Sequence, residues 1–353
     1  MKNCIIVFVL FFTSITGYSQ NLYAGIEIGS KGLKVYVYDI KNLEDEVFEL
    51  QKFWSDNIDI QRGIMYEGEF LNRDIESTSK KIVADLTRLE TEYKIDKSKT
   101  FIAISSGISF AKNVNELVTK IKKTTTIDAQ IVSYEIESKL MFKSCVLPKN
   151  FNESLILDLG SGNVYGGFIN TVNKQQVFKS FSVNIGTMAM CELLYQKAKT
   201  YKTDEFISLL EDYKPTLKKE ITEMFDSEPL HYQKKNVYLT GGATWAFFTL
   251  FNGGDNQDNY VEFKLKDVLD YDEVLRTDFI KYKSKAVEDK YVRKVINTFT
   301  QENLIAANEI LISTLSNIQN IEKKKLYYSK QSETTWLVPF IADNLKGKKV
   351  GSF

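Results

Sequence analysis

The chain has 353 residues, of which 43% are hydrophobic and 26% are charged, values usual for a globular protein. It carries 46 basic and 46 acidic residues, so we expect no basic field that would bind nucleic acid, and any preference for anions must be local. The length suggests two domains, at about 150 residues each. His231 is the only histidine, which excludes a histidine-rich metal site; it stands in a polar stretch and is expected in an exposed loop.

Residues 1–20 have the pattern of a secretory signal peptide. Lys2 precedes an apolar run at 4–12 that is short for a membrane span, and polar and small residues follow up to an expected cleavage site near Gln20. We therefore predict a periplasmic or secreted protein without a stable membrane anchor, the alternative being an uncleaved anchor. The two remaining cysteines, Cys145 and Cys191, are expected to be buried free thiols, although an oxidising compartment would allow them to pair.

Residues 21–150 alternate between buried strands and amphipathic helices. The predicted strands are 22–28, 33–39, 46–54, 99–105 and 130–133, and the predicted helices are 72–93 and 110–123, followed by a segment that starts at Tyr134. A polar connection is expected at 56–69. This alternation favours an α/β arrangement around a mixed or parallel sheet.

Residues 151–353 begin with a hairpin at 155–167 and then become mainly helical. Further strands are predicted at 175–184 and 236–239, and helices at 188–199, 204–224, 243–251 and within 265–324. The apolar stripe of this last region is expected to be core. A flexible loop is expected at 252–260, and the segment 333–345 fits either a strand or a helix.

Two hairpins carry an acidic residue followed by a glycine turn. Asp158 follows the apolar strand 155–157 and precedes Gly160, and Glu27 precedes Gly29 in the same way, about 130 residues earlier. Glycine turns let backbone N–H groups approach phosphate oxygens, and a carboxylate at the strand end can hold a divalent cation or its waters. An ordinary hairpin is the alternative for either copy alone, but two copies suggest related halves that face each other across a cleft. A third glycine turn, at 237–244, ends a strand and opens a helix.

The order of these motifs resembles that of the Ppx/GppA phosphatases, which are exopolyphosphatases and guanosine pentaphosphate phosphatases of the actin/Hsp70/sugar-kinase superfamily. The segments that carry the resemblance are GIEIGS at 25–30, ISS at 104–106, VSYEIESKL at 132–140, LDLGSGN at 157–163, FSVNIGT at 181–187 and LTGGAT at 239–244. Together they cover residues 22 to about 250 in the family's order.

The resemblance implies a two-lobed actin-like ATPase (ribonuclease H-like) α/β fold, with lobes at 21–150 and 151–353 and a cleft between them. It implies that Glu137 activates the attacking water and that Glu27 and Asp158 hold Mg²⁺. The terminal phosphoryl group of polyphosphate or a nucleotide polyphosphate would be bound by a set of loop residues, namely Gly29, Ser30, Lys31, Ser105, Gly160, Ser161, Gly162, Asn163, Gly241 and Gly242. A homodimer is left open.

The chain also departs from the family pattern. Glu27 replaces an aspartate, Lys31 replaces an asparagine, the family's arginine falls near Ser109, and the second loop loses a carboxylate at Tyr165. The first hypothesis is therefore a secreted phosphatase that cuts terminal phosphoanhydride bonds. The alternatives are a binding protein of the same fold without hydrolysis, which the lost arginine and carboxylate favour, and an actin-like scaffold.

Overall fold

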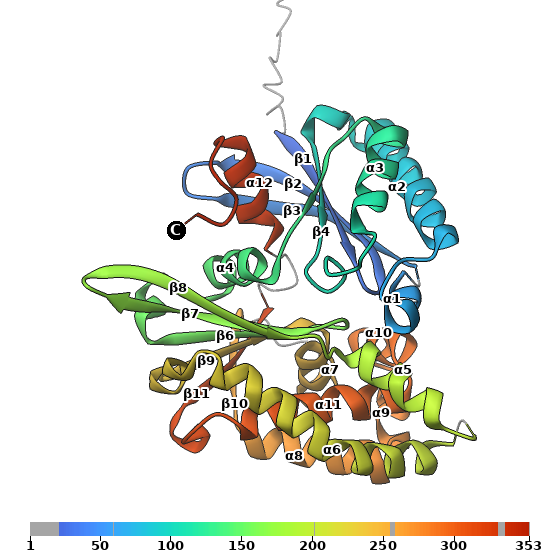
Figure 1. Cartoon of the computed structure of the whole chain (residues 1–353), viewed down its shortest axis with the longest axis vertical. Coiled ribbons are helices and arrows are strands. Elements are labelled where there is room, and N and C mark those ends of the chain that lie inside the picture. Colours follow the sequence, from blue (N-terminus) through green and yellow to red (C-terminus); the bar gives the residue numbers. More distant parts are fainter. Residues whose placement is uncertain (1–20, 59, 201, 255–257, 331–335, 353) are drawn as a thin grey trace, which may run out of the picture.

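The computed structural model describes residues 21–352 except 59, 201, 255–257 and 331–335, and it shows two lobes that each contain one β-sheet (Figure 1). The predicted signal peptide at 1–20 lies outside the described residues. Within the described ranges, no helix is both long enough and apolar enough to span a membrane.

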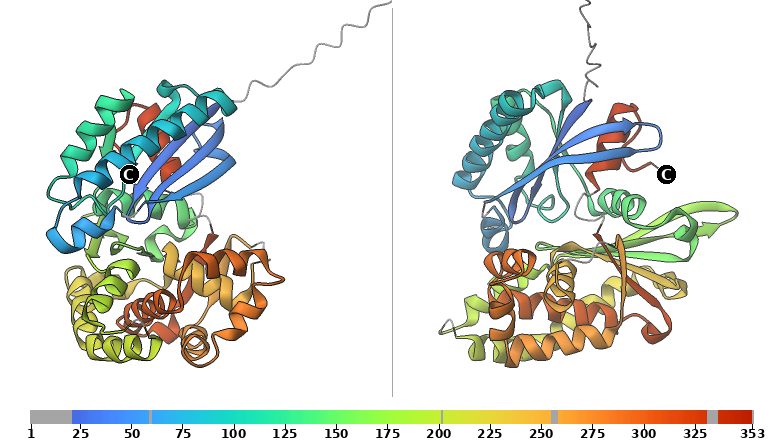
Figure 2. Two further views of the ribbon diagram at one scale, coloured as in Figure 1. Left: turned by 90° about the vertical axis from the view of Figure 1, so that its right-hand side faces the viewer. Right: turned by 180° about the vertical axis from the view of Figure 1, so that it is seen from behind.

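The N-terminal lobe has a five-stranded sheet in the order β3-β2-β1-β4-β5. Strands β1 to β3 form an antiparallel meander, and β4 and β5 join β1 in parallel. Helices α2 and α3 cover one face of this sheet (Figure 2). The elements of the lobe are β1 (Leu22–Gly29), β2 (Gly32–Asn42), β3 (Val47–Asn57), α1 (Gln61–Glu67), α2 (Asn72–Tyr93), β4 (Thr100–Ile104), α3 (Val114–Thr125), β5 (Ala129–Ile131) and α4 (Tyr134–Cys145).

The C-terminal lobe has a six-stranded sheet in the order β10-β11-β9-β6-β7-β8, with its large helical core on one face (Figure 1). Its elements are β6 (Ser154–Leu159), β7 (Val164–Val172), β8 (Gln175–Val183), α5 (Thr187–Lys197), α6 (Thr203–Asp226), β9 (Asn236–Thr240), α7 (Gly241–Asn252), β10 (Tyr260–Phe263), α8 (Leu265–Thr277), α9 (Ile280–Lys285), α10 (Lys290–Thr298), α11 (Gln301–Ser316), β11 (Lys325–Ser329) and α12 (Leu337–Leu345). Helix α11 is buried along most of its length, as its apolar stripe predicted.

A layer of helix lies between the two sheets. Helix α4 packs against β6, β7 and β8, while α12 returns from the end of the chain to pack against β1 and α4. Gly25 of β1 makes this return possible, because a Cβ atom there would lie 3.1 Å from Ile341 and 3.2 Å from Leu337. The proposed domain boundary at residue 150 stays a prediction. Helix α12, at the end of the chain, packs on strand β1 of the N-terminal sheet.

Some expectations need correction. Residues 56–69 contain the short helix α1, and the helical region 265–324 is followed by the unpredicted strand β11, which pairs with β9 and the equally unpredicted β10. The described part of the segment 333–345 is helical. His231 is only 6% exposed and stacks on Phe225, so its assignment to an exposed loop was wrong; its flanking residues are polar, but a nearby aromatic cluster encloses the ring.

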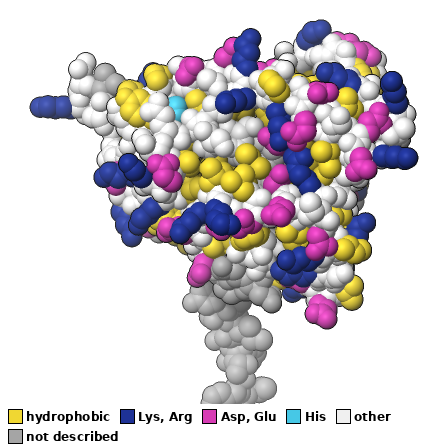
Figure 3. Space-filling view, turned by 90° about the horizontal axis from the view of Figure 1, so that it is seen from below, with side chains coloured by type: hydrophobic (Ala, Val, Ile, Leu, Met, Phe, Trp, Pro, Cys, Tyr) yellow, Lys and Arg dark blue, Asp and Glu magenta, His cyan; other side chains and the backbone are white. Residues whose placement is uncertain are grey.

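The two cysteines agree with expectation, since both are free and buried. The face seen from below agrees with the expectation that the protein has no basic field. On this face, basic and acidic side chains are interspersed around a group of hydrophobic ones (Figure 3). No single-sign field covers that face.

Candidate functional site

The two acidic hairpins have matching geometry. In the first, β1 and β2 pair antiparallel with Glu27 opposite Lys34. In the second, β6 and β7 pair antiparallel with Asp158 opposite Tyr165. Residues directly opposite each other in an antiparallel pair share one face of the sheet. Each hairpin therefore presents one carboxylate together with one cross-strand partner, and the partners differ.

Three predicted acidic residues from both halves of the chain come together. Glu27, Glu137 and Asp158 are 5%, 5% and 7% exposed, and Glu137 enters from the first turn of α4. Burial raises the pKa of Glu137 to about 8, and the charges of Glu27 and Asp158 add to this effect. Burial also raises the pKa of Asp158 to about 6, against an opposing hydrogen bond from Thr240. The charges of the three carboxylates thus act on one another, as the predicted common site requires.

Polar groups that sequence reasoning left out of the site hold Glu137 and Asp158 in place. One oxygen of Glu137 accepts a hydrogen bond from the backbone N–H of Ser106 at 2.6 Å, and the other accepts from the Tyr165 hydroxyl at 3.1 Å. The Thr240 hydroxyl donates to Asp158 at 2.7 Å. Tyr165 could have been found by counting residues across the hairpin. Ser106 follows β4 and Thr240 ends β9, and the sequence does not show that these strands pair with β1 and β6.

The glycine loops of the two lobes touch each other. The hydroxyl oxygens of Ser30 and Ser161 are hydrogen-bonded at 2.5 Å, and the Asn163 amide donates to the Ser106 hydroxyl at 3.1 Å. A Cβ atom on Gly162 would lie 2.3 Å from the carbonyl oxygen of Gly107, so only glycine permits this approach. The structure is therefore closed at the loops.

Most of the predicted phosphate-binding residues surround the carboxylates. Positions Gly29 and Gly160 lie beside them, because Cβ atoms there would be 3.4 Å from Glu27 Oε1 and 3.3 Å from Asp158 Oδ1, and Ser105 lies close to Gly29. The residues at or between the meeting loops are Gly29, Ser30, Ser105, Gly160, Ser161, Gly162 and Asn163.

At Gly241, the first residue of the late glycine pair, the structure explains why a glycine is needed. Gly241 has a φ of +90° and begins α7, and a Cβ atom on it would lie 2.4 Å from the carbonyl oxygen of Leu159. A side chain is therefore excluded where α7 starts beside the end of β6. Gly242 is less confined, since its nearest neighbour would be Phe299 at 3.8 Å.

Lys31 contacts two groups of the C-terminal lobe. Its ammonium group sits 3.7 Å from the ring centroid of Phe299 and 3.4 Å from the carbonyl oxygen of Thr298, both in the C-terminal lobe. Burial lowers the pKa of Lys31 to about 8. Lys31 thus bridges the lobes through a cation–π contact, and its predicted role as a phosphate ligand stays a prediction.

The residues present do not fit a divalent cation shared by Glu27 and Asp158. The Lys34 ammonium lies 2.9 Å from Glu27 Oε1, so a positive charge already stands at this carboxylate. In the described part of the chain, no three His, Cys, Asp or Glu side chains gather as a metal site. The ammonium of Lys34 therefore stands against the predicted roles of Glu27 and Asp158 as metal ligands, which stay predictions.

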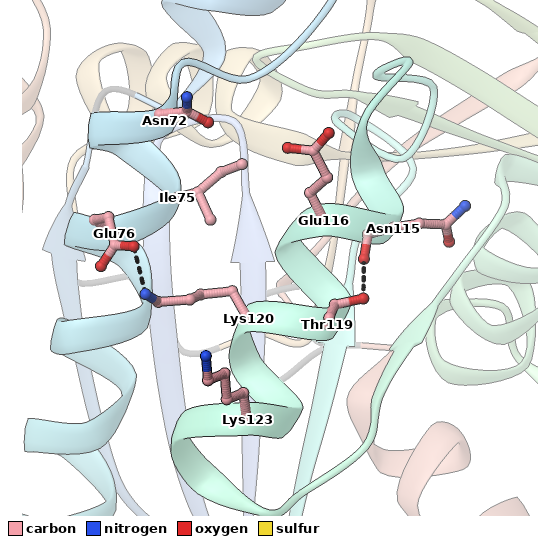
Figure 4. Close-up of a pocket in the computed structure, with 8 residues that line it drawn as sticks. All are labelled: Asn72, Ile75, Glu76, Asn115, Glu116, Thr119, Lys120 and Lys123. Atoms are coloured by element: carbon pink, nitrogen blue, oxygen red, sulfur yellow. Dashed lines mark hydrogen bonds and ion pairs between the residues drawn. The ribbon is translucent and has the colours of Figure 1, made fainter.

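A depression on the outer surface of the N-terminal lobe is unrelated to this site. It lies between α2 and α3, is bridged by the ion pair of Glu76 and Lys120, and contains no predicted site residue (Figure 4). Its walls are the solvent-facing sides of the two helices. The chemistry-bearing groups lie between the lobes instead.

Comparison with known proteins settles the fold. No protein-family model and no curated protein matches the sequence. A solved structure of an Aquifex aeolicus member of the Ppx/GppA protein family is 17% identical over 92% of this chain and 98% of its own, with a TM-score of 0.63. An exopolyphosphatase from Cytophaga hutchinsonii is 14% identical over 93% of this chain and 99% of its own, with a TM-score of 0.67. The chain has the Ppx/GppA fold.

The predicted two-lobed, actin-like α/β fold is therefore confirmed. An exopolyphosphatase-like protein gives the same result at a TM-score of 0.69 and 14% identity. Tyr165, at which the resemblance implies the loss of a carboxylate, donates a hydrogen bond from its hydroxyl to Glu137.

Proposed function

We propose that this chain is a phosphoanhydride hydrolase that removes terminal phosphoryl groups from polyphosphate or a nucleotide polyphosphate. The observation that carries the proposal is Glu137, a buried carboxylic acid beside two glycine loops contributed by different lobes. Solved structures of the same fold include a protein named as an exopolyphosphatase. That name supports the choice of substrate class.

Glu137 would position the attacking water and take its proton. A general base works best when its pKa lies near the operating pH, and burial raises the pKa of Glu137 to about 8. The N–H of Ser106 and the hydroxyl of Tyr165 orient its two oxygens. Backbone N–H groups of the loops would bind the phosphoryl oxygens once the contact between Ser30 and Ser161 opens.

A binding protein without turnover is the second candidate. It is favoured by the same hydrogen bonds, which occupy both oxygens of Glu137, and by a raised pKa that keeps the group protonated near neutral pH. Export, predicted from residues 1–20, makes inorganic polyphosphate the preferred substrate, because nucleotides are scarce outside the cytoplasm.

The decisive experiment measures phosphate release from polyphosphate by the wild type and by Glu137→Gln, with and without Mg²⁺. Hydrolysis predicts release that falls at least about 100-fold in the variant, the usual contribution of a general base. Thermal stabilisation by polyphosphate without release would identify the binding protein. Neither release nor stabilisation would refute both candidates.

A further inference from the structure

Lys34 is the basic residue that the structure places at the three carboxylates. It lies opposite Glu27 in the β1–β2 hairpin, and its ammonium group is 2.9 Å from Glu27 Oε1. Its side chain is 45% exposed, and its ammonium group is held by Glu27. An ammonium carries three donors, and one contact to Glu27 leaves donors for a second, anionic partner.

The charge of Lys34 also reaches the other acidic groups. The pKa of Lys34 is raised, because its desolvation is outweighed by the ion pair with Glu27 and by the charges of Asp158 and Glu137. Lys34 in turn works to lower the pKa of Asp158. A cation shared by Glu27 and Asp158 would stabilise the same two carboxylates. Lys34 therefore already supplies the charge that such a cation would supply.

We propose that the Lys34 ammonium is the fixed cation of this site, so that the chain binds a phosphoryl group without a divalent metal ion. A divalent ion at Glu27 would approach the ammonium closely, and two cations about 4 Å apart repel each other by several kcal/mol at an effective dielectric constant near 20. The second oxygen of Glu27 is buried without a hydrogen-bond partner in the described structure, so this carboxylate keeps one free acceptor beside the ammonium. The ligand class is a phosphate or polyphosphate anion.

This inference deepens the proposed function and rests on it for the identity of the anion, but its first test does not need turnover. Isothermal titration of Mn²⁺ into the purified protein should show no saturable site in the wild type. Lys34→Met removes the ammonium and should gain a saturable Mn²⁺ site, at least about tenfold tighter than any residual binding by the wild type, which equals about 1.4 kcal/mol. Adding Glu27→Gln to Lys34→Met should remove that site again.

Lys41→Met is the matched control. Lys41 lies on the same strand and pairs with another buried carboxylate, that of Asp39, at 2.6 Å. It should gain no Mn²⁺ site. If Lys34→Met does not fold, Lys34→Arg keeps the cation and should remain metal-free, with polyphosphate still raising its melting temperature in the presence of EDTA.

Two results would overturn the inference. Stoichiometric Mn²⁺ binding by the wild type that Asp158→Asn abolishes would identify a metal site despite Lys34. Loss of polyphosphate stabilisation in EDTA, with recovery in Mg²⁺, would show that the anion needs a divalent ion. If polyphosphate has no effect under any condition, the proposed function fails, while the Mn²⁺ titrations still decide whether Lys34 excludes the metal.

Discussion

Replacing Glu137 by glutamine should make the folded protein more stable, even though the residue is central to the proposed activity. Glu137 is a buried acid whose ionisation is opposed by burial and by two other carboxylates. Glutamine has nearly the same shape and no charge. Its amide oxygen can accept from the N–H of Ser106, and its amide N–H can donate to the hydroxyl oxygen of Tyr165, so both existing contacts have a substitute.

The size of the effect follows from the pKa. Glu137 has a pKa of about 8 in the folded protein, compared with an ordinary value of 4.5. Because the folded pKa is raised, the stabilising contribution of the protonated acid is fully present below pH 4.5 and is lost as pH rises through 8. The loss is about 1.4 kcal/mol per pH unit in this window, or roughly 3 kcal/mol at pH 7. Glu137→Gln carries no such loss.

Urea unfolding of both proteins between pH 5 and pH 9 measures this difference. The free energy of unfolding of Glu137→Gln should exceed that of the wild type by an amount that grows with pH and levels off above about 8. The control is Glu135→Gln, in the same turn of α4 but exposed, whose difference from the wild type should stay nearly flat. A Glu137→Gln difference that is independent of pH would refute the raised pKa and the electrostatic coupling behind it.

Three further predictions test the surroundings of the site and the core. Gly162→Ala should lower the free energy of unfolding in urea by about 1–3 kcal/mol, because the added Cβ atom would lie 2.3 Å from the carbonyl oxygen of Gly107; an unchanged value would show that the loops do not touch. Burial lowers the pKa of His231, so the wild type should lose stability as pH falls below 6.5, and His231→Phe should remove this loss in calorimetric melts; equal slopes for both proteins would contradict its burial. Cys145 and Cys191 should resist iodoacetamide in the native protein and react fully in urea, since burial raises the pKa of both thiols to about 12; rapid native labelling would show that they are accessible.

Local pattern predicted the regular elements well where one face of an element is buried. The helix at 72–93 has the predicted bounds, because its buried residues recur at helical spacing and its other face is solvated. The last helix, α12, could not be assigned from pattern, since it lies between β1 and α4 and is apolar on several sides. Strand β11 was missed because its pairing with β9 joins residues about ninety positions apart.

The acidic residues of the site could be predicted from the sequence, whereas most of their hydrogen-bond and ion-pair partners could not. An acidic residue between an apolar strand and a glycine turn marked Glu27 and Asp158. The cross-strand partner of each acid follows from the register of a two-residue turn, so Lys34 was open to prediction from the sequence. The contact of Lys31 with Phe299 could not be predicted, because the ring lies 268 positions later in the chain and only tertiary folding brings it near.

The way in which the three carboxylates are stabilised supports the proposed reactive site over a structural ion-pair cluster. Glu27 is paired with an ammonium, Asp158 accepts from a hydroxyl, and burial raises the pKa of Glu137 to about 8. A cluster that served only to join the lobes would gain most from fully paired carboxylates with lowered pKa values. Burial raises the pKa of Asp158 to about 6 and that of Glu137 to about 8, the range in which the proposed general acid or base would work.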